Sequence, residues 1–243
     1  MASDPDRFAS FTASSTSVPP TPPAREPVFN APIAAILLAL SIPGLYALQM
    51  QLPDAGLRWA FRPVSLFEGG WWPGVLTSMI LHGGWTHALI NAGFAFAFGP
   101  AVARLFPGVK GGLVFLGYYI VCGLAGTLGY GLVHPDSTAT LVGASGAVMG
   151  LLGGAIRLLG TQGRPRPLTD RRVIGMSVAV LALNVVTGLI GLAPGVDDAQ
   201  IAWEAHAFGF LAGILLIGPA ARLFGTRTAP AFASDGRMGD PPR

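Results

Sequence analysis

Long apolar runs constrain the fold of this chain more than any other feature of its sequence. A helix of about 20 apolar residues is enough to cross the hydrocarbon core of a bilayer. The composition is 51% hydrophobic and 11% charged, as expected for a membrane protein rather than a soluble one. We therefore predict an all-α, polytopic membrane protein with a bundle of six transmembrane helices. The six runs lie at about 31–50, 86–106, 111–133, 145–159, 173–192 and 201–217.

The distribution of basic residues predicts how the chain is oriented. Six spans place both ends on one side, and thirteen of the fifteen Arg and Lys residues then share that side, Arg58 and Arg62 being the exceptions. Cytoplasmic loops carry an excess of Lys and Arg, so both termini are expected in the cytoplasm. The frequent use of Ala, Gly and Pro favours a bacterial source, so the expected location is the inner membrane. Because the basic residues flank the spans and form no stripe, nucleic-acid binding is not expected.

The segments outside the spans have simple compositions. Residues 1–29 are rich in Ser, Thr and Pro and are expected to be a disordered cytoplasmic tail, as are residues 223–243, which leaves 30–222 as the six-span domain. Residues 51–85 mix tryptophans with charges, which is typical of a loop partly embedded at the bilayer surface. Cys122 is the only cysteine, so neither a disulfide within the chain nor a cysteine metal cluster is expected, and no cofactor is predicted.

Ser145 is the strongest candidate for chemistry. It lies between Ala144 and Gly146, after Gly143, where a carbonyl group could reach both its hydroxyl and free backbone N–H groups. Such a serine can also be a packing residue between membrane helices. The run that begins at Ser145 is too short to span, so Ser145 is expected at a helix N-terminus inside the membrane, where the helix dipole favours an oxyanion. Gly150 and Gly154 extend the glycine face that Gly146 begins.

His206 is the candidate general base. It shares a helix face with Gly209 and Gly213, because residues three and four apart are neighbours on a helix. If this face packs on Gly146, Gly150 and Gly154, His206 arrives near Ser145 and can accept its proton. Glu204 is two residues away and points elsewhere, so we predict a Ser-His dyad without a third member.

A pair of side chains in the second run could stabilise an oxyanion. His87 and Asn91 are four residues apart, on one helix face, and both can donate hydrogen bonds, so together with Gly143 and the backbone of Ser145 they could form an oxyanion hole. Each histidine alone could equally make an ordinary interhelical hydrogen bond. A metal-dependent protease is not indicated, since the spacing from His82 to His87 differs from His-Glu-x2-His and includes no glutamate.

These motifs together resemble those of the rhomboid intramembrane serine proteases. The resemblance covers about residues 30–220 and implies that Ser145 is the nucleophile, His206 the general base, and His87 and Asn91 the oxyanion donors. It also implies that His82 mainly holds the loop before the second span. The motifs are His82-x4-His87-x3-Asn91, Gly143-Ala144-Ser145-Gly146 and Ala205-His206-x2-Gly209-x3-Gly213.

The resemblance implies a substrate class as well. Family members cleave transmembrane helices of other proteins near their outer ends, so the expected partners are transmembrane substrates, which would approach through the bilayer past the fifth span. Two positions depart from the family pattern: Ala103 stands where a glutamate is common, and Met149 where a tyrosine often lies under the catalytic histidine. Two alternatives from other classes are a catalytically inactive rhomboid-like protein that binds membrane clients, and a small transporter or channel.

Overall fold

The computed structural model describes residues 31–191 and 202–225. The expected tail at 1–29 and residues 226–243 of the tail expected at 223–243 lie outside the described residues. The elements are α1 (Ile33–Gln49), η1 (Pro53–Trp59), α2 (Pro63–Phe67), α3 (Pro73–Thr77), η2 (Ser78–Ile80), α4 (Trp85–Ala103), α5 (Gly108–Val133), α6 (Ser145–Leu158), α7 (Arg171–Ile190) and α8 (Trp203–Phe224).

The six apolar helices that the sequence predicts are all present. Four of them, α4, α5, α7 and α8, are long and apolar enough to cross a membrane. Helix α1 has 17 residues and reaches the required length only together with η1, from which it is bent by 118°. Helix α6 has only 14 residues, which confirms the expectation of a short fourth helix. The chain is therefore an all-helical polytopic membrane protein.

Some helix boundaries differ from those expected. Helix α4 ends at Ala103 rather than near Phe106, because Phe106 precedes Pro107 and the residue before a proline avoids the helical conformation. Helix α8 does not end near Ile217 but continues to Phe224 with Pro219 inside it. Proline is tolerated in membrane helices when neighbouring groups satisfy the freed backbone.

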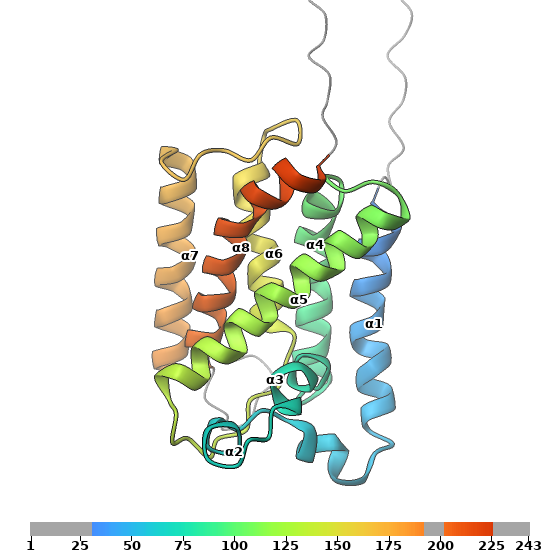
Figure 1. Cartoon of the computed structure of the whole chain (residues 1–243), viewed down its shortest axis with the longest axis vertical. Coiled ribbons are helices and arrows are strands. Elements are labelled where there is room, and N and C mark those ends of the chain that lie inside the picture. Colours follow the sequence, from blue (N-terminus) through green and yellow to red (C-terminus); the bar gives the residue numbers. More distant parts are fainter. Residues whose placement is uncertain (1–30, 192–201, 226–243) are drawn as a thin grey trace, which may run out of the picture. The chain divides into compact units, whose positions relative to one another are not determined.

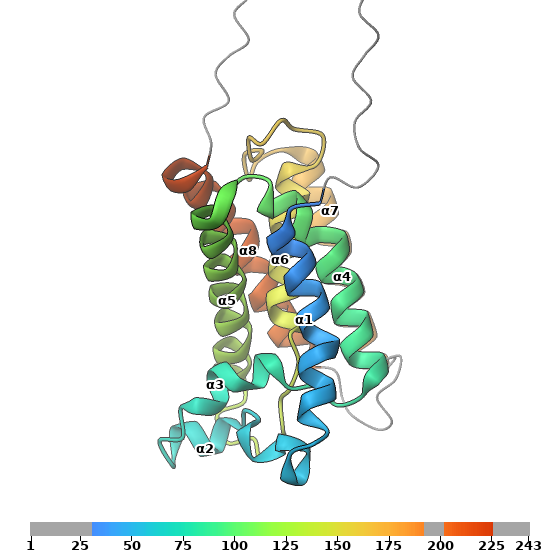
Figure 2. The ribbon, with the colours of Figure 1, turned by 90° about the vertical axis from the view of Figure 1, so that its right-hand side faces the viewer.

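Helix α6 lies at the centre of the bundle. It packs against α4, α5 and α8, while α1 packs mainly on α4. Helix α7 stands at the edge, beside α8, as Figure 1 shows. The two perpendicular views agree that the connection after α5 returns from one end of the bundle into its interior, where α6 begins (Figure 1, Figure 2). This return places the N-terminus of α6 inside the bundle.

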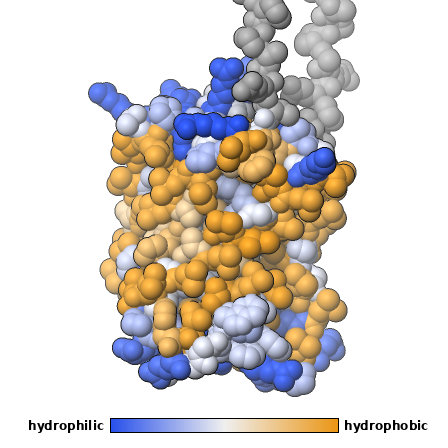
Figure 3. Space-filling model, viewed as in Figure 1, coloured by the Kyte–Doolittle hydropathy of each residue, from blue (hydrophilic) through white to orange (hydrophobic). Residues whose placement is uncertain are grey.

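The outer surface of the bundle is apolar. On the face in Figure 3, a broad hydrophobic belt separates polar groups at the two ends. Helix α7 contributes strongly to this surface: Val178, Leu183 and Leu189 are more than three-fifths exposed, and Val173 and Asn184 are its only buried residues. Such a surface fits contact with lipid acyl chains.

The first loop is more ordered than a plain connection between spans. The segment predicted as a long interfacial connection contains η1, α2, α3 and η2. Backbone hydrogen bonds tie it to the α5–α6 connection: the N–H of Phe61 donates to Leu141 O over 3.1 Å, and the N–H of Leu141 to Phe61 O over 2.8 Å. Trp72 is 68% exposed, as expected at an interface. The loop thereby supports the chain that leads into α6.

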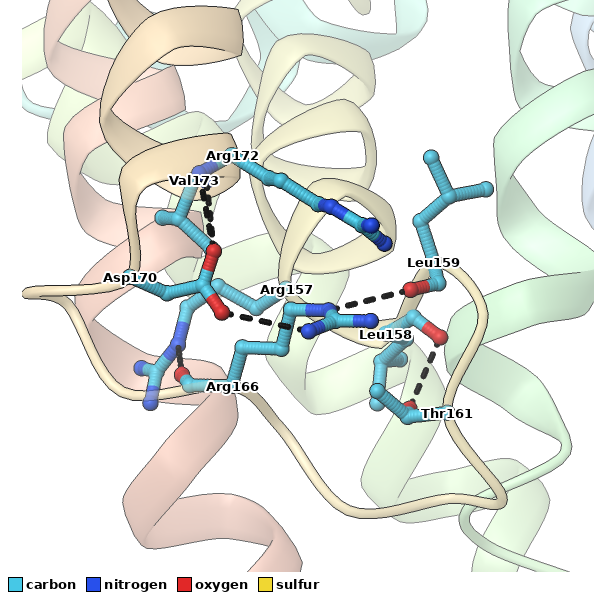
Figure 4. Close-up of polar contacts among 8 residues, drawn as sticks. All are labelled: Arg157, Leu158, Leu159, Thr161, Arg166, Asp170, Arg172 and Val173. Carbon is cyan, nitrogen blue, oxygen red and sulfur yellow. Dashed lines mark hydrogen bonds and ion pairs between the residues drawn. The ribbon is translucent and has the colours of Figure 1, made fainter.

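At the other end of the bundle, Arg157 ties α6 to its neighbours. Its Nε donates to Arg166 O at 2.7 Å, and its Nη1 to Ile214 O of α8 at 2.8 Å. Arg166 in turn forms an ion pair with Asp170 at 3.1 Å. Asp170 caps α7 by accepting the N–H of Arg172, a bond that lowers the pKa of its carboxyl group (Figure 4). These bonds hold the α6–α7 connection against the bundle.

Candidate active site

Ser145 is the first residue of α6 and is half-buried among buried neighbours. Two features place it there. Gly143 has a φ of 125°, a conformation that favours glycine. Its N–H donates to Ser78 O at 2.9 Å, which fixes the chain just before the helix. The preceding residue, Ala144, has no side chain that can cap the helix, so the first N–H groups of α6 have neither an intrahelical partner nor a side-chain cap.

The ring of His87 lies against Gly143. A β-carbon on Gly143 would stand 2.7 Å from Cε1 and 2.8 Å from Nε2 of His87, and 3.7 Å from the Ser145 hydroxyl oxygen. The space beside Gly143 is therefore bounded by the His87 ring and by the Ser145 hydroxyl group. On its other side, His87 Nδ1 accepts the N–H of Gly83 over 3.5 Å. An accepting Nδ1 requires the ring hydrogen on Nε2, the nitrogen that faces Gly143.

Asn91 lies one helical turn beyond His87 and is buried, with 3% of its surface exposed. Its amide nitrogen is buried and has no hydrogen-bond partner among the described residues. Leaving such a donor unpaired costs about 1 to 3 kcal/mol. A buried donor without a partner, one helical turn from His87, is able to stabilise a developing negative charge.

His82 is held in the loop before α4. Gln49 of α1 bonds its backbone on both sides, donating to His82 O at 2.9 Å and accepting the His82 N–H at 2.8 Å. The imidazole is buried, and neither of its nitrogens has a partner among the described residues. It makes edge contacts with the rings of Tyr46 and His87, at centroid distances of 6.4 and 5.2 Å. Burial, with a smaller contribution from His87, lowers its pKa to about 4.

Helices α6 and α8 touch backbone to backbone. A β-carbon on Gly209 would overlap the carbonyl group of Gly146, and one on Gly213 would overlap that of Gly150. The glycine face predicted for α8 thus packs on α6. The Tyr118 hydroxyl of α5 lies 3.0 Å from Gly150 O and 2.8 Å from Gly213 O, so it closes the contact from the third helix.

One glycine of the predicted face lies elsewhere. Gly154 faces α5, where an added β-carbon would be 2.5 Å from the Tyr118 hydroxyl, and does not face α8. Its place is taken by Gly153, whose β-carbon would be 2.6 Å from Phe210 O of α8. The reason is geometric: a helix has 3.6 residues per turn, so a four-residue repeat drifts around its axis.

His206 lies beside the start of α6. A β-carbon on Gly146 would be 3.3 Å from the carbonyl oxygen of Ala205, so the residues next to Ser145 and His206 are in contact. No hydrogen bond joins the Ser145 hydroxyl to His206 within the described part of the chain. Catalytic hydrogen bonds are often long before substrate binds.

We predicted a Ser-His dyad without a third member, and the structure adds a polar neighbour of His206 that the sequence analysis did not name. Nδ1 of His206 lies 3.0 Å from Oδ1 of Asn184, on α7. Sequence reasoning missed Asn184, although a polar residue within an apolar run is a signal that could have found it. Glu204 does point elsewhere, as predicted, and pairs with His134 at 2.8 Å.

Ala103 and Met149, the two positions that depart from the family pattern, both lie among apolar side chains. Ala103 is buried, with 2% exposure, and Met149 packs on a cluster that includes Phe210 and Ile214.

Among residues 31–191 and 202–225, no three His, Cys, Asp or Glu side chains gather closely enough to hold a metal ion.

Comparison with known proteins identifies relatives of this chain. The Rhomboid domain family matches residues 68–222. YdcA, a rhomboid protein of Bacillus subtilis (strain 168), is 32% identical over 158 residues, which cover 63% of this chain and 69% of the relative. RHOMBOID-like protein 5 of Arabidopsis thaliana is 29% identical over 184 residues, covering 74% and 51%. Rhomboid protease AarA of Providencia stuartii is 29% identical over 165 residues, covering 61% and 55%. The chain thus spans about half of the length of the latter two.

Proposed function

The chain belongs to the rhomboid family, and on that premise we propose that it is an intramembrane serine endopeptidase that cleaves transmembrane segments of other membrane proteins. In this proposal Ser145 is the nucleophile, His206 the general base, and His87 and Asn91 the oxyanion donors. The observation that supports it most is the backbone contact of Gly146 with Ala205 and Gly209, because Gly146 follows Ser145 and Ala205 precedes His206.

The chemistry follows from the groups present. The Ser145 hydroxyl oxygen attacks the substrate carbonyl while Nε2 of His206 accepts its proton. The resulting oxyanion accepts hydrogen bonds from His87 Nε2–H, from the unpartnered amide of Asn91 and from the free N–H groups at the start of α6. His206 then donates the proton to the leaving amine, and water, activated by the same histidine, releases the acyl group from Ser145.

The orientation is part of the proposal. The end of α6, with Arg157 in its last turn, and the basic α6–α7 connection lie at the end of the bundle away from the first loop (Figure 1). This arrangement favours the cytoplasm at that end and an outward-facing site near Ser145. Both termini are then cytoplasmic, in a bacterial inner membrane. A client helix would enter through the lipid beside α7, the helix that is most exposed at the edge of the bundle.

The test uses purified protein in liposomes with a model transmembrane substrate that carries small residues near its outer end. Wild type is expected to cut within or beside the apolar segment, Ser145→Ala and His206→Ala to be inactive, and a chelator to change nothing. Products are identified by mass spectrometry. Cleavage that survives Ser145→Ala would contradict the mechanism, and a wild type that binds the substrate without cutting it would favour a client-binding role.

A further inference from the structure

Asn184 is an unusual residue in α7. The helix is largely exposed and apolar, yet Asn184, which lies within it, is only 6% exposed. Its amide makes two hydrogen bonds to α8: Nδ2 donates to Trp203 O at 2.7 Å, and Oδ1 lies 3.0 Å from His206 Nδ1. One turn further along, a β-carbon on Gly188 would be 2.5 Å from Cβ of Trp203. This close approach holds α7 against the start of α8, in register for both bonds.

The two bonds determine how the amide and the imidazole are protonated. A backbone carbonyl oxygen only accepts, so the group of Asn184 that faces Trp203 O must be the NH₂. The amide oxygen then faces the ring of His206, and because this oxygen also only accepts, Nδ1 must carry the hydrogen. A neutral imidazole with its hydrogen on Nδ1 has a free lone pair on Nε2.

We propose that Asn184 is a positioning residue for His206, which selects the tautomer and ring orientation that a general base needs. The inference rests on the function proposed above. In the other tautomer Nε2 carries hydrogen and cannot accept the proton of Ser145. When His206 becomes an imidazolium during acylation, its Nδ1–H still has an acceptor. The amide is neutral, so its contribution is orientation, without the charge that a carboxylate would add.

The proposal predicts a separation between chemistry and binding. Asn184→Leu keeps the size of the side chain and removes both bonds, so kcat should fall about tenfold or more while KM changes little, because the substrate contacts are untouched. Asn184→Asp keeps an acceptor for Nδ1 and should retain more activity than Asn184→Leu. The matched control is Ser177→Ala on the same helix, since the one hydrogen bond of the Ser177 hydroxyl among the described residues runs to Val173 O, within α7.

The deciding measurement is the tautomer itself. In protein with ¹⁵N-labelled histidine in micelles at pH 8, the two ring nitrogens of His206 are assigned by their loss in His206→Gln. The wild type and Asn184→Asp should show the hydrogen on Nδ1, and Asn184→Leu a mixture of tautomers. An unchanged tautomer in Asn184→Leu, or a kcat that falls no further than in Ser177→Ala, would overturn the proposal. A wild type that fails to cleave contradicts the proposed function, and the tautomer shift then decides the role of Asn184 by itself.

Discussion

Gly209 of α8 lies directly on the carbonyl group of Gly146 in α6, with no room for a β-carbon between them. This contact sets the distance between the two helices that carry Ser145 and His206. The same feature repeats one turn further along, where Gly213 meets Gly150. Close approach of this kind is how small residues bring membrane helices together.

Gly209→Ala should therefore damage both stability and activity. The new methyl group overlaps backbone, which cannot rotate away, so the helices must separate, at a cost of about 1 to 3 kcal/mol. We expect a lower Tm in micelles and loss of cleavage. Gly117→Ala in α5 is the control, because a β-carbon there has no neighbour within 4 Å. Equal Tm values for the two variants would contradict this account.

Gly143→Ala should impair catalysis through His87. The β-carbon would collide with the ring, and the φ of 125° disfavours alanine. Displacing an oxyanion donor should lower kcat on the order of 10²-fold. Gly70→Ala in the first loop separates backbone strain from collision with a side chain. Gly70 has a positive φ of 65°, but its β-carbon would meet nothing within 4 Å. Peptide cleavage and labelling of Ser145 by a fluorophosphonate measure the result, and similar losses in both variants would make strain, not His87, the cause.

Asn91→Ala tests the unpartnered amide. If Asn91 donates to an oxyanion, kcat should fall on the order of 10²- to 10³-fold. The loss of stability should be small, because removing a buried donor without a partner offsets part of the cavity that alanine leaves. Cleavage rate and Tm are measured together, with Thr86→Ala at an exposed position of α4 as control. A large drop in Tm with unchanged kcat would assign Asn91 a structural role only.

His82 should make the fold sensitive to acid. The folded protein keeps its imidazole neutral down to about pH 4, whereas the unfolded chain takes up a proton near pH 6.5. Between these values the unfolded state binds more protons, so stability is fully present above pH 6.5 and declines as the pH falls toward 4, by at most roughly 3 kcal/mol. Tm measured from pH 7.5 to 5 should fall less in His82→Leu than in wild type. If Tm fell equally with pH in wild type and in His82→Leu, another group would be responsible for the sensitivity to acid.

Much of the fold could be read from the sequence because its signals are local. Apolar runs of the right length predict helices wherever they occur, and the run from Ser145 to Leu159 was predicted to form a short helix, as it does. Helical periodicity put His206 on one face with Gly209 and Gly213, and His87 on one face with Asn91. The ordered helices of the first loop were missed, since they depend on pairing with residues near Leu141.

The tertiary structure decided which faces meet. Periodicity shows that residues share a helix face but says nothing about the rotation or axial position of the neighbour that this face touches. For that reason Gly154 was assigned to the contact with α8 although it meets Tyr118, and the bond from Asn184 to His206 was not foreseen. Helix α7 is apolar on nearly every side, so its sequence can single out Asn184 as unusual but does not say which residue of a neighbouring helix Asn184 meets. Only packing against α8, with Gly188 against Trp203, determines that Asn184 faces the histidine.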